Sequence, residues 1–281
     1  MDVEKYLDGV FEVVKDVLLG IKWLKACSIV VFGSAARPED FVKGVSDVDV
    51  LVLTREEPSK RRYSFVVSDS KVDVVLFTVA EFEKLVRWGN PLAFVLKRCV
   101  VLYDGCFKHI LKLKPEITEH TRDVLRKSIF AALGLSLESY YFLEDYVKAL
   151  SHLYHSLRHL IRYKASFYGK FPISDQEVCE YCRGRLKDVY VKLLDLRKRG
   201  VQKSDLEELM DAVIRLVAEE LNLRVTSLKD IEDKVEGSIN LVVAGEIDGY
   251  IVFRVETYKD GRRKIVEVKD GRVREVDRLF F

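Results

Sequence analysis

The spacing of hydrophobic residues changes twice along the chain, near residues 115 and 230. Before the first change, residues 2–19 carry apolar side chains at helical spacing, which predicts an amphipathic helix. Short apolar runs rich in β-branched residues predict strands, and two further segments have helical patterns. The strands are expected at 28–32, 48–53, 72–78 and 100–103, and the helices at 79–88 and 91–97. Strands interleaved with helices predict a small α/β or α+β domain over residues 1–115.

The middle and the end of the chain have different patterns. Residues 116–230 carry Leu, Ile, Phe and Tyr at intervals of three and four, which predicts a helical bundle. Capping-box patterns at 174–177 and 204–207 predict that two of its helices begin there. Residues 231–281 read as four strands, with Asp260-Gly261 and Asp270-Gly271 at tight hairpin turns, so we expect a small antiparallel β-meander. These patterns divide the chain into three domains.

Composition limits the classes of function. With 48% hydrophobic and 33% charged residues the chain can bury a core, which excludes intrinsic disorder. The 47 basic and 45 acidic residues nearly cancel, so any attraction for phosphate must be local. No apolar run approaches the roughly 18 to 20 residues that cross a bilayer, and Met1 opens an acidic amphipathic stretch without a signal-peptide core, so we expect a cytoplasmic protein. Asn and Gln together number only five, a bias typical of hyperthermophiles, which suggests a thermophilic source.

Two groups of residues leave alternatives open. Cys179 and Cys182 have the spacing of half a zinc site, but no second pair of ligands follows, so reduced buried thiols are the simpler interpretation. In a hyperthermophile, an intracellular disulfide there or elsewhere is a third interpretation. His152, His155 and His159 fall on one face of the expected helix, where a packed or interdomain face is favoured over a metal or acid-base role.

One constellation in the first domain carries chemistry. Gly33 and Ser34 end a strand, so their backbone amides can approach a phosphate, and the positive end of a following helix would favour the anion. Asp47 and Asp49 alternate with apolar residues, which places them on one face of a strand, about 6 to 7 Å apart. Asp73 lies within another apolar strand, where an ionised carboxylate is costly unless it is paired or bound to metal. Together the three acids could share a divalent cation.

In this order, these residues resemble the nucleotidyltransferase superfamily that includes DNA polymerase β, kanamycin nucleotidyltransferase and the CCA-adding enzymes. The resemblance covers residues 25–80 and rests on Gly33-Ser34, Asp47-Val48-Asp49 and Asp73, and Ala36-Arg37 is similar to the Ala-Arg of the smaller members. Arg37-Pro38-Glu39 replaces the common Arg-Gly, so the phosphate role of Arg37 is less secure than the role of the acids. Together with the patterns above, the resemblance predicts an α+β fold: a mixed-sheet nucleotidyltransferase domain (1–115), followed by the helical bundle (116–230) and the small β subdomain (231–281).

The resemblance also implies an activity: transfer of a nucleoside monophosphate from an NTP, with ATP as the expected donor, to an acceptor hydroxyl of a small molecule, protein or RNA end. Asp47, Asp49 and Asp73 would hold Mg²⁺, with Mn²⁺ as the alternative, in a two-metal mechanism. Asp73 could act instead as the general base. Gly33, Ser34 and Arg37 would contact the triphosphate. The competing interpretation is a nucleotide-binding regulatory or antitoxin-like module with little turnover.

The middle of the chain carries a second resemblance. Residues 149–172 look like the long helix and following loop of HEPN domains, which accompany small nucleotidyltransferases in prokaryotes. HEPN ribonucleases need a histidine shortly after a late arginine, and no histidine follows His159, which disfavours RNA cleavage. Residues 183–203 carry eight basic and two acidic residues and could contact a polyanion, but acids at 204–220 are expected to neutralise them, so nucleic acid is not the favoured partner. A homo-oligomer remains open.

Overall fold

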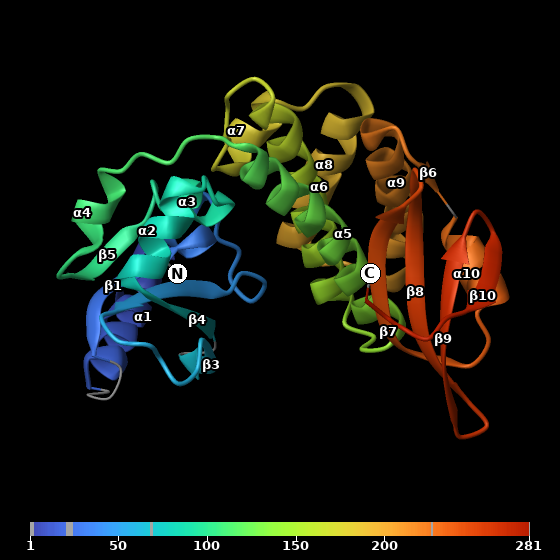
Figure 1. The fold of residues 1–281 in the computed structure, drawn as a ribbon, viewed down its shortest axis with the longest axis horizontal. Coiled ribbons are helices and arrows are strands. Elements are labelled where there is room, and N and C mark those ends of the chain that lie inside the picture. Colours follow the sequence, from blue (N-terminus) through green and yellow to red (C-terminus); the bar gives the residue numbers. More distant parts are fainter. Residues whose placement is uncertain (1–2, 21–24, 68–69, 226, 281) are drawn as a thin grey trace. The chain divides into compact units, whose positions relative to one another are not determined.

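The computed structural model describes residues 3–20, 25–67, 70–225 and 227–280, and contacts between residues divide the chain into two compact units. The first unit comprises residues 1–124 and 169–177, and the second comprises residues 125–168 and 178–281. The mixed α and β character, with a mixed sheet first, helices in the middle and strands last, is confirmed (Figure 1). No helix in these ranges is long and apolar enough to span a membrane.

A five-stranded mixed sheet forms the centre of the first unit, in the order β3-β4-β2-β1-β5. Strands β2 and β4 are parallel, and the other neighbours are antiparallel. The strands are β1 (Ala26–Phe32), β2 (Val48–Thr54), β3 (Arg62–Val67), β4 (Ser70–Thr78) and β5 (Val100–Asp104). The sequence pattern predicted four of these strands and missed β3, an edge strand in which exposed and partly buried residues alternate.

Helices cover both faces of this sheet. The amphipathic helix α1 (Val3–Gly20) packs on one face through Leu7, Val10 and Val14, as its helical spacing predicted. The opposite face packs on three short helices: α2 (Val79–Arg87), α3 (Pro91–Val95) and α4 (Phe107–Leu111). Two 3₁₀ turns, η2 (Gly33–Ala36) and η3 (Pro38–Asp40), connect β1 to β2. Every strand of the sheet except β3 therefore packs against apolar side chains on both sides.

The second unit combines helices and a second sheet around one core. Its helices are α5 (Glu119–Tyr141), α6 (Tyr146–Ser166), α7 (Asp175–Glu180), α8 (Gly184–Arg199), α9 (Lys203–Leu221) and α10 (Leu228–Lys234), of which α5 and α7 begin in the first unit. Its strands are β6 (Arg224–Val225), β7 (Ser238–Ile247), β8 (Tyr250–Lys259), β9 (Arg262–Lys269) and β10 (Arg272–Glu275). Strands β7 to β10 form the expected meander, with β6 added parallel to β8.

Two compact units are found where the sequence suggested three domains, because the bundle and the meander share their core. Side chains of α5, α6, α8 and α9 pack with those of β7, β8 and β9 in a single hydrophobic cluster. Gly134 of α5 lies so close to the backbone of Val242 and Ala244 that a Cβ there would need the strand to shift. The boundaries at 115 and 230 stay predictions about which segments fold alone.

The predicted helix starts are partly corrected. Ser174 and Glu177 bond to each other's backbone amides at the start of α7, as the capping box predicted. At α9 the capping residues are Gln202 and Asp205 rather than Ser204 and Glu207. The Glu207 carboxylate instead accepts a hydrogen bond from the Tyr140 hydroxyl at 2.7 Å, a tertiary partner that the local pattern cannot reveal.

Candidate active site

Three carboxylates gather where β2 and β4 begin. Asp49 and Asp73 are direct neighbours in the parallel register of these strands, and Asp47 lies just before β2. Alternation along the strands places all three on the face that carries Leu51 and Leu53 into the core formed with α2, α3 and α4. The structure therefore brings the three predicted acids to one edge of one sheet face, beyond the part of that face that the helices cover.

The end of β1 reaches the same place through Gly33. Phe32 is the antiparallel neighbour of Asp49, and Gly33 follows with φ of 72°. A Cβ at Gly33 would overlap the Oδ2 atom of Asp49. Only glycine satisfies both the left-handed backbone and this close approach. The helix expected after Gly33-Ser34 is only the 3₁₀ turn η2, so a long helix dipole is not available to an anion there.

Ser34 and Arg37 differ in accessibility. Ser34 is half-buried within η2, whereas the side chain of Arg37 is only 3% exposed. Arg37 donates from Nε to Oδ2 of Asp40 at 2.6 Å, and the Oδ1 atom of Asp40 accepts the backbone N–H of Asp175 at 3.1 Å. This buried ion pair argues against direct contact of Arg37 with a phosphate in solvent. It fixes the turn between β1 and β2 from within.

Lys71 is a site residue that sequence reasoning missed. Its Nζ lies 2.5 Å from Oδ2 of Asp73 and 3.3 Å from Oδ2 of Asp47, so the ammonium lies between two of the acids. On the other side, the Ser64 hydroxyl of β3 donates to Oδ1 of Asp73 at 2.6 Å. The signal for Lys71 was present, since a residue two positions before Asp73 on a strand must lie on the same face. Ser64 gave no such signal, because β3 itself was not predicted.

Asp49 has the most perturbed acidity in the cluster. Burial, followed by the negative charges of Asp47 and Asp73, raises its pKa to about 7, and the positive charges of Lys71 and Arg37 oppose that shift. In the absence of a cation, therefore, Asp49 is close to half-protonated at neutral pH. Because the ionised form of Asp49 is unfavourable in the metal-free site, a bound cation would stabilise that form strongly.

The donor set fits a hard divalent cation, because it consists of carboxylate oxygens. No group of three acidic, histidine or cysteine side chains lies close enough to hold a metal ion in the part of the chain that is described, however, and Lys71 stands among the acids. Asp47, Asp49 and Asp73 are the residues that would hold such an ion. Lys71 must then release Asp47 and Asp73.

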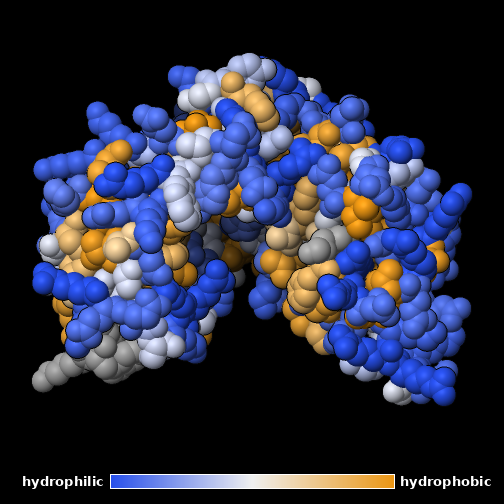
Figure 2. All heavy atoms as spheres, viewed as in Figure 1, coloured by the Kyte–Doolittle hydropathy of each residue, from blue (hydrophilic) through white to orange (hydrophobic). Residues whose placement is uncertain are grey.

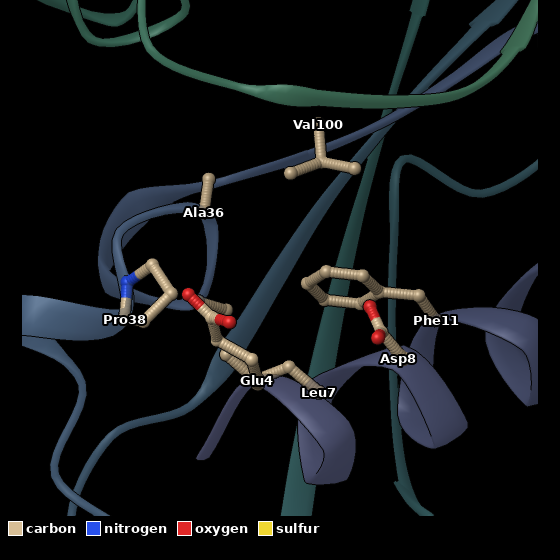
Figure 3. Close-up of a pocket in the computed structure, with 8 residues that line it drawn as sticks. Glu4, Leu7, Asp8, Phe11, Ala36, Pro38 and Val100 are labelled. Atoms are coloured by element: carbon tan, nitrogen blue, oxygen red, sulfur yellow. The ribbon is translucent and has the colours of Figure 1, made fainter. Parts of the chain in front are cut away.

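A separate groove of about 260 Å³ lies behind the same turn (Figure 3). It runs between α1 and η2, with Leu7, Phe11 and Val100 as apolar lining and the carboxylates of Glu4 and Asp8 beside them. Among the described residues its lining is mostly apolar and includes no basic residue, so this groove is not a second candidate for the phosphate site.

The other residues that the sequence singled out lie in the second unit. His155 stacks edge-on against Tyr154 at 5.0 Å, and burial, followed by Arg162 and Arg158, lowers the pKa of His159 to about 3. Both rings are thus packed and neutral at pH 7, since the pKa of His155 is also lowered by burial. Cys182 is fully buried, donates to the carbonyl of Val178 at 3.2 Å, and its pKa is raised to about 12 by burial.

Comparisons with known proteins give one family match, which lies within the first unit. Residues 15–124 match the family model of the nucleotidyltransferase domain. Among solved structures, a nucleotidyltransferase-like protein from Exiguobacterium sibiricum 255-15 aligns with 15% identity and a TM-score of 0.34, over 70% of this chain and 69% of that chain. No curated protein matches the chain. None of these comparisons confirms the HEPN-like character expected for residues 149–172.

Proposed function

We propose that the protein transfers a nucleoside monophosphate from an NTP to an acceptor hydroxyl and releases pyrophosphate, because residues 15–124 match the family model of the nucleotidyltransferase domain. The carrying observation is the cluster of Asp47, Asp49 and Asp73 on one sheet face, next to Gly33. ATP is the first donor to test, with Mg²⁺ as the ion and Mn²⁺ as its substitute. A cytoplasmic location, a thermophilic source and a homo-oligomer stay predictions from the sequence.

We assign the three acids different roles according to their positions on the two strands. Asp47 and Asp49, at the start of β2, would hold the cation beside the triphosphate, while Asp73, on the neighbouring strand β4, would face the acceptor hydroxyl. Asp73 either completes the metal site or takes the acceptor proton itself as general base. When bound, the divalent ions polarise the phosphoryl oxygens and acidify the acceptor hydroxyl.

The turn after β1 serves the triphosphate. Gly33 and Ser34 present backbone amides at the sheet edge, and Gly33 has no side chain to separate the phosphates from Asp49. Arg37 acts indirectly in this proposal: its buried pair with Asp40 fixes the turn, and its charge favours the ionised form of Asp49.

One observation favours a second candidate, a nucleotide-binding module with little turnover. Lys71 already satisfies two of the three acids, and an ammonium that stays there would compete with a catalytic ion. The two candidate functions differ in one property: whether a metal ion displaces the Lys71 ammonium from Asp47 and Asp73.

The test is incubation of the purified protein with each α-labelled NTP, Mg²⁺ and an extract that supplies acceptors. Label on an acceptor, with pyrophosphate release, supports transfer if it disappears in Asp47→Asn and Asp49→Asn. Asp16→Asn, an exposed acid on α1, is the matched control and should keep the activity. Saturable nucleotide binding without label or pyrophosphate for any of the four nucleotides would favour the binding module.

A further inference from the structure

Two cysteines 79 positions apart meet in the first unit, outside the acid cluster. Cys27 lies near the start of β1, and Cys106 precedes the first residue of α4. Their Sγ atoms are 2.8 Å apart. A disulfide bond is about 2.05 Å long, so the sulfurs need to approach by less than 1 Å to be bonded.

The backbone around the two sulfurs is fixed in this arrangement. The Gly105 N–H donates to the Cys27 carbonyl at 2.7 Å, and a Cβ at Gly105 would overlap that same carbonyl oxygen. The Ser28 hydroxyl oxygen lies within hydrogen-bond distance of three successive backbone amides, those of Gly105, Cys106 and Phe107, at 3.2, 3.1 and 3.1 Å. Strands β1 and β5 also pair here, with Ser28 opposite Asp104.

We propose that Cys27 and Cys106 are a disulfide cross-link site of this protein, with a low-molecular-weight disulfide such as oxidised glutathione as the oxidant. The geometry is preorganised because five separate backbone constraints hold the two residues together before any bond forms. The loop that the bond closes contains every residue of the candidate active site, from Gly33 to Asp73.

The two sulfurs have different parts in the reaction. Cys27 is 5% exposed, and burial, followed by the neighbouring Cys106 thiol, raises its pKa to about 12, whereas Cys106 is half-buried. Cys106 therefore attacks the oxidised glutathione first as its thiolate, expelling one glutathione and forming a mixed disulfide. Cys27 then attacks the Cys106 sulfur and expels the second glutathione. Two protein thiols are oxidised, one disulfide is reduced, and both protons end on glutathione.

The cross-link should raise thermal stability, because closing a loop of this length restricts the unfolded chain. For a loop of this size the melting temperature of the oxidised protein should exceed that of the reduced protein by roughly 5 to 15 °C. The effect does not depend on the proposed activity.

The test treats the full chain with oxidised glutathione and counts thiols after denaturation. We expect three of the five thiols to remain, a loss of two hydrogen atoms in intact mass, and a peptide that joins Cys27 to Cys106. Five remaining thiols, or glutathione left on Cys106 without the joined peptide, would overturn the proposal.

Variants separate this pair from the other cysteines. Cys106→Ala and Cys27→Ala should lose the difference in melting temperature between oxidised and reduced samples, whereas Cys99→Ala, in the same unit, should keep it. Each difference is measured within one variant, so a substitution that weakens the fold in general does not affect the result. An undiminished difference in Cys106→Ala would assign the stabilisation to another pair and contradict the proposal.

Discussion

Asp49 in the first unit and Glu267 in the second both lie on strands that have a neighbour on each side, but the charges next to them differ in sign. Each lies on a strand between two neighbours, Asp49 on β2 beside Asp73 and Glu267 on β9 between Arg254 and Arg274. Glu267 is completely buried, yet its oxygens accept from Arg254 at 3.0 Å and from Arg274 at 2.7 Å. Asp49 is only half-buried, yet its strand neighbour is another acid.

The difference separates a charge-compensated acid from one that lies beside another acid. A buried carboxylate with two arginines across the strands has its charge compensated. Figure 2 shows mostly hydrophilic residues around β9 and β10, with some apolar residues among them. A carboxylate beside other carboxylates lowers the stability of the metal-free protein through charge repulsion. A bound cation would remove that repulsion, which favours cation binding. Burial alone therefore does not distinguish the candidate site, whereas the charge at the neighbouring strand position does: an acid beside Asp49 and arginines beside Glu267.

The largest expected effect comes from removing the charge of Asp49. Asp49→Asn should lower kcat/KM for nucleotidyl transfer by about 1,000-fold or more, because a metal ligand next to the triphosphate is lost. The same substitution should raise the melting temperature of the metal-free protein at neutral pH, since the repulsion from Asp47 and Asp73 disappears. Pyrophosphate release and thermal denaturation measure the two results. A variant that is both inactive and less stable would contradict this account of Asp49.

Glu267→Gln should act on stability alone. It leaves the largely buried Arg254 without its charge partner, which should lower the free energy of unfolding by about 2 to 3 kcal/mol while nucleotidyl transfer stays unchanged. Urea denaturation measures the change. Glu275→Gln is the matched control, because Glu275 pairs with Lys264 on the exposed surface and should contribute about 0.5 kcal/mol or less. Equal effects of the two variants would mean that burial does not distinguish these acids.

The pH dependence of stability should carry the signature of Asp49. Its pKa is about 7 in the folded, metal-free protein and 3.8 ordinarily, so between these values the folded state keeps a proton that the unfolded chain has lost. The stability from this group is complete below 3.8 and is lost as pH rises through 7. Urea unfolding in the presence of a chelator should show wild type falling relative to Asp49→Asn across this range. A constant difference between the two proteins would be inconsistent with the raised pKa.

The smallest effect is expected at Lys71. Lys71→Met removes the ammonium that pairs with Asp47 and Asp73, so the affinity for Mn²⁺ should rise about threefold. The change is modest because these ion pairs are partly exposed to solvent. Calorimetric titration without nucleotide measures it independently of activity. Ser64→Ala removes only a neutral donor to Asp73 and should leave the affinity unchanged. Weaker metal binding in Lys71→Met would show that the lysine assists the ion rather than competing with it.

The sequence predicted the acids because local alternation determines them. Asp47 and Asp49 had to share a face, and Asp73 had to lie on a buried strand, once their apolar neighbours were read as strands. Gly33 was predicted as a phosphate contact, but its close approach to Asp49 depends on how β1 and β2 pair, which spacing does not encode.

Other parts of the site depend on contacts between distant segments. Arg37 reads as an exposed phosphate ligand until Asp40 and the backbone of Asp175 enclose it. Cys27 and Cys106 are unrelated in sequence and meet only through the pairing of β1 with β5. The merging of bundle and meander into one unit likewise follows from packing across a single core, which no local pattern reveals.

The first unit is completed by residues 169–177, and this has a consequence for biosynthesis. Phe171 stacks on Phe94 at 4.5 Å, Glu177 pairs with Arg98 at 2.5 Å, and the Asp175 amide binds Asp40. A ribosome must therefore translate α5 and α6 before the Asp175 amide can bind Asp40 and complete the turn that carries Arg37. Until then the nascent first unit holds its acids without the segment that fixes the turn, and a gene fragment that stops at residue 124 would produce the same unfinished state.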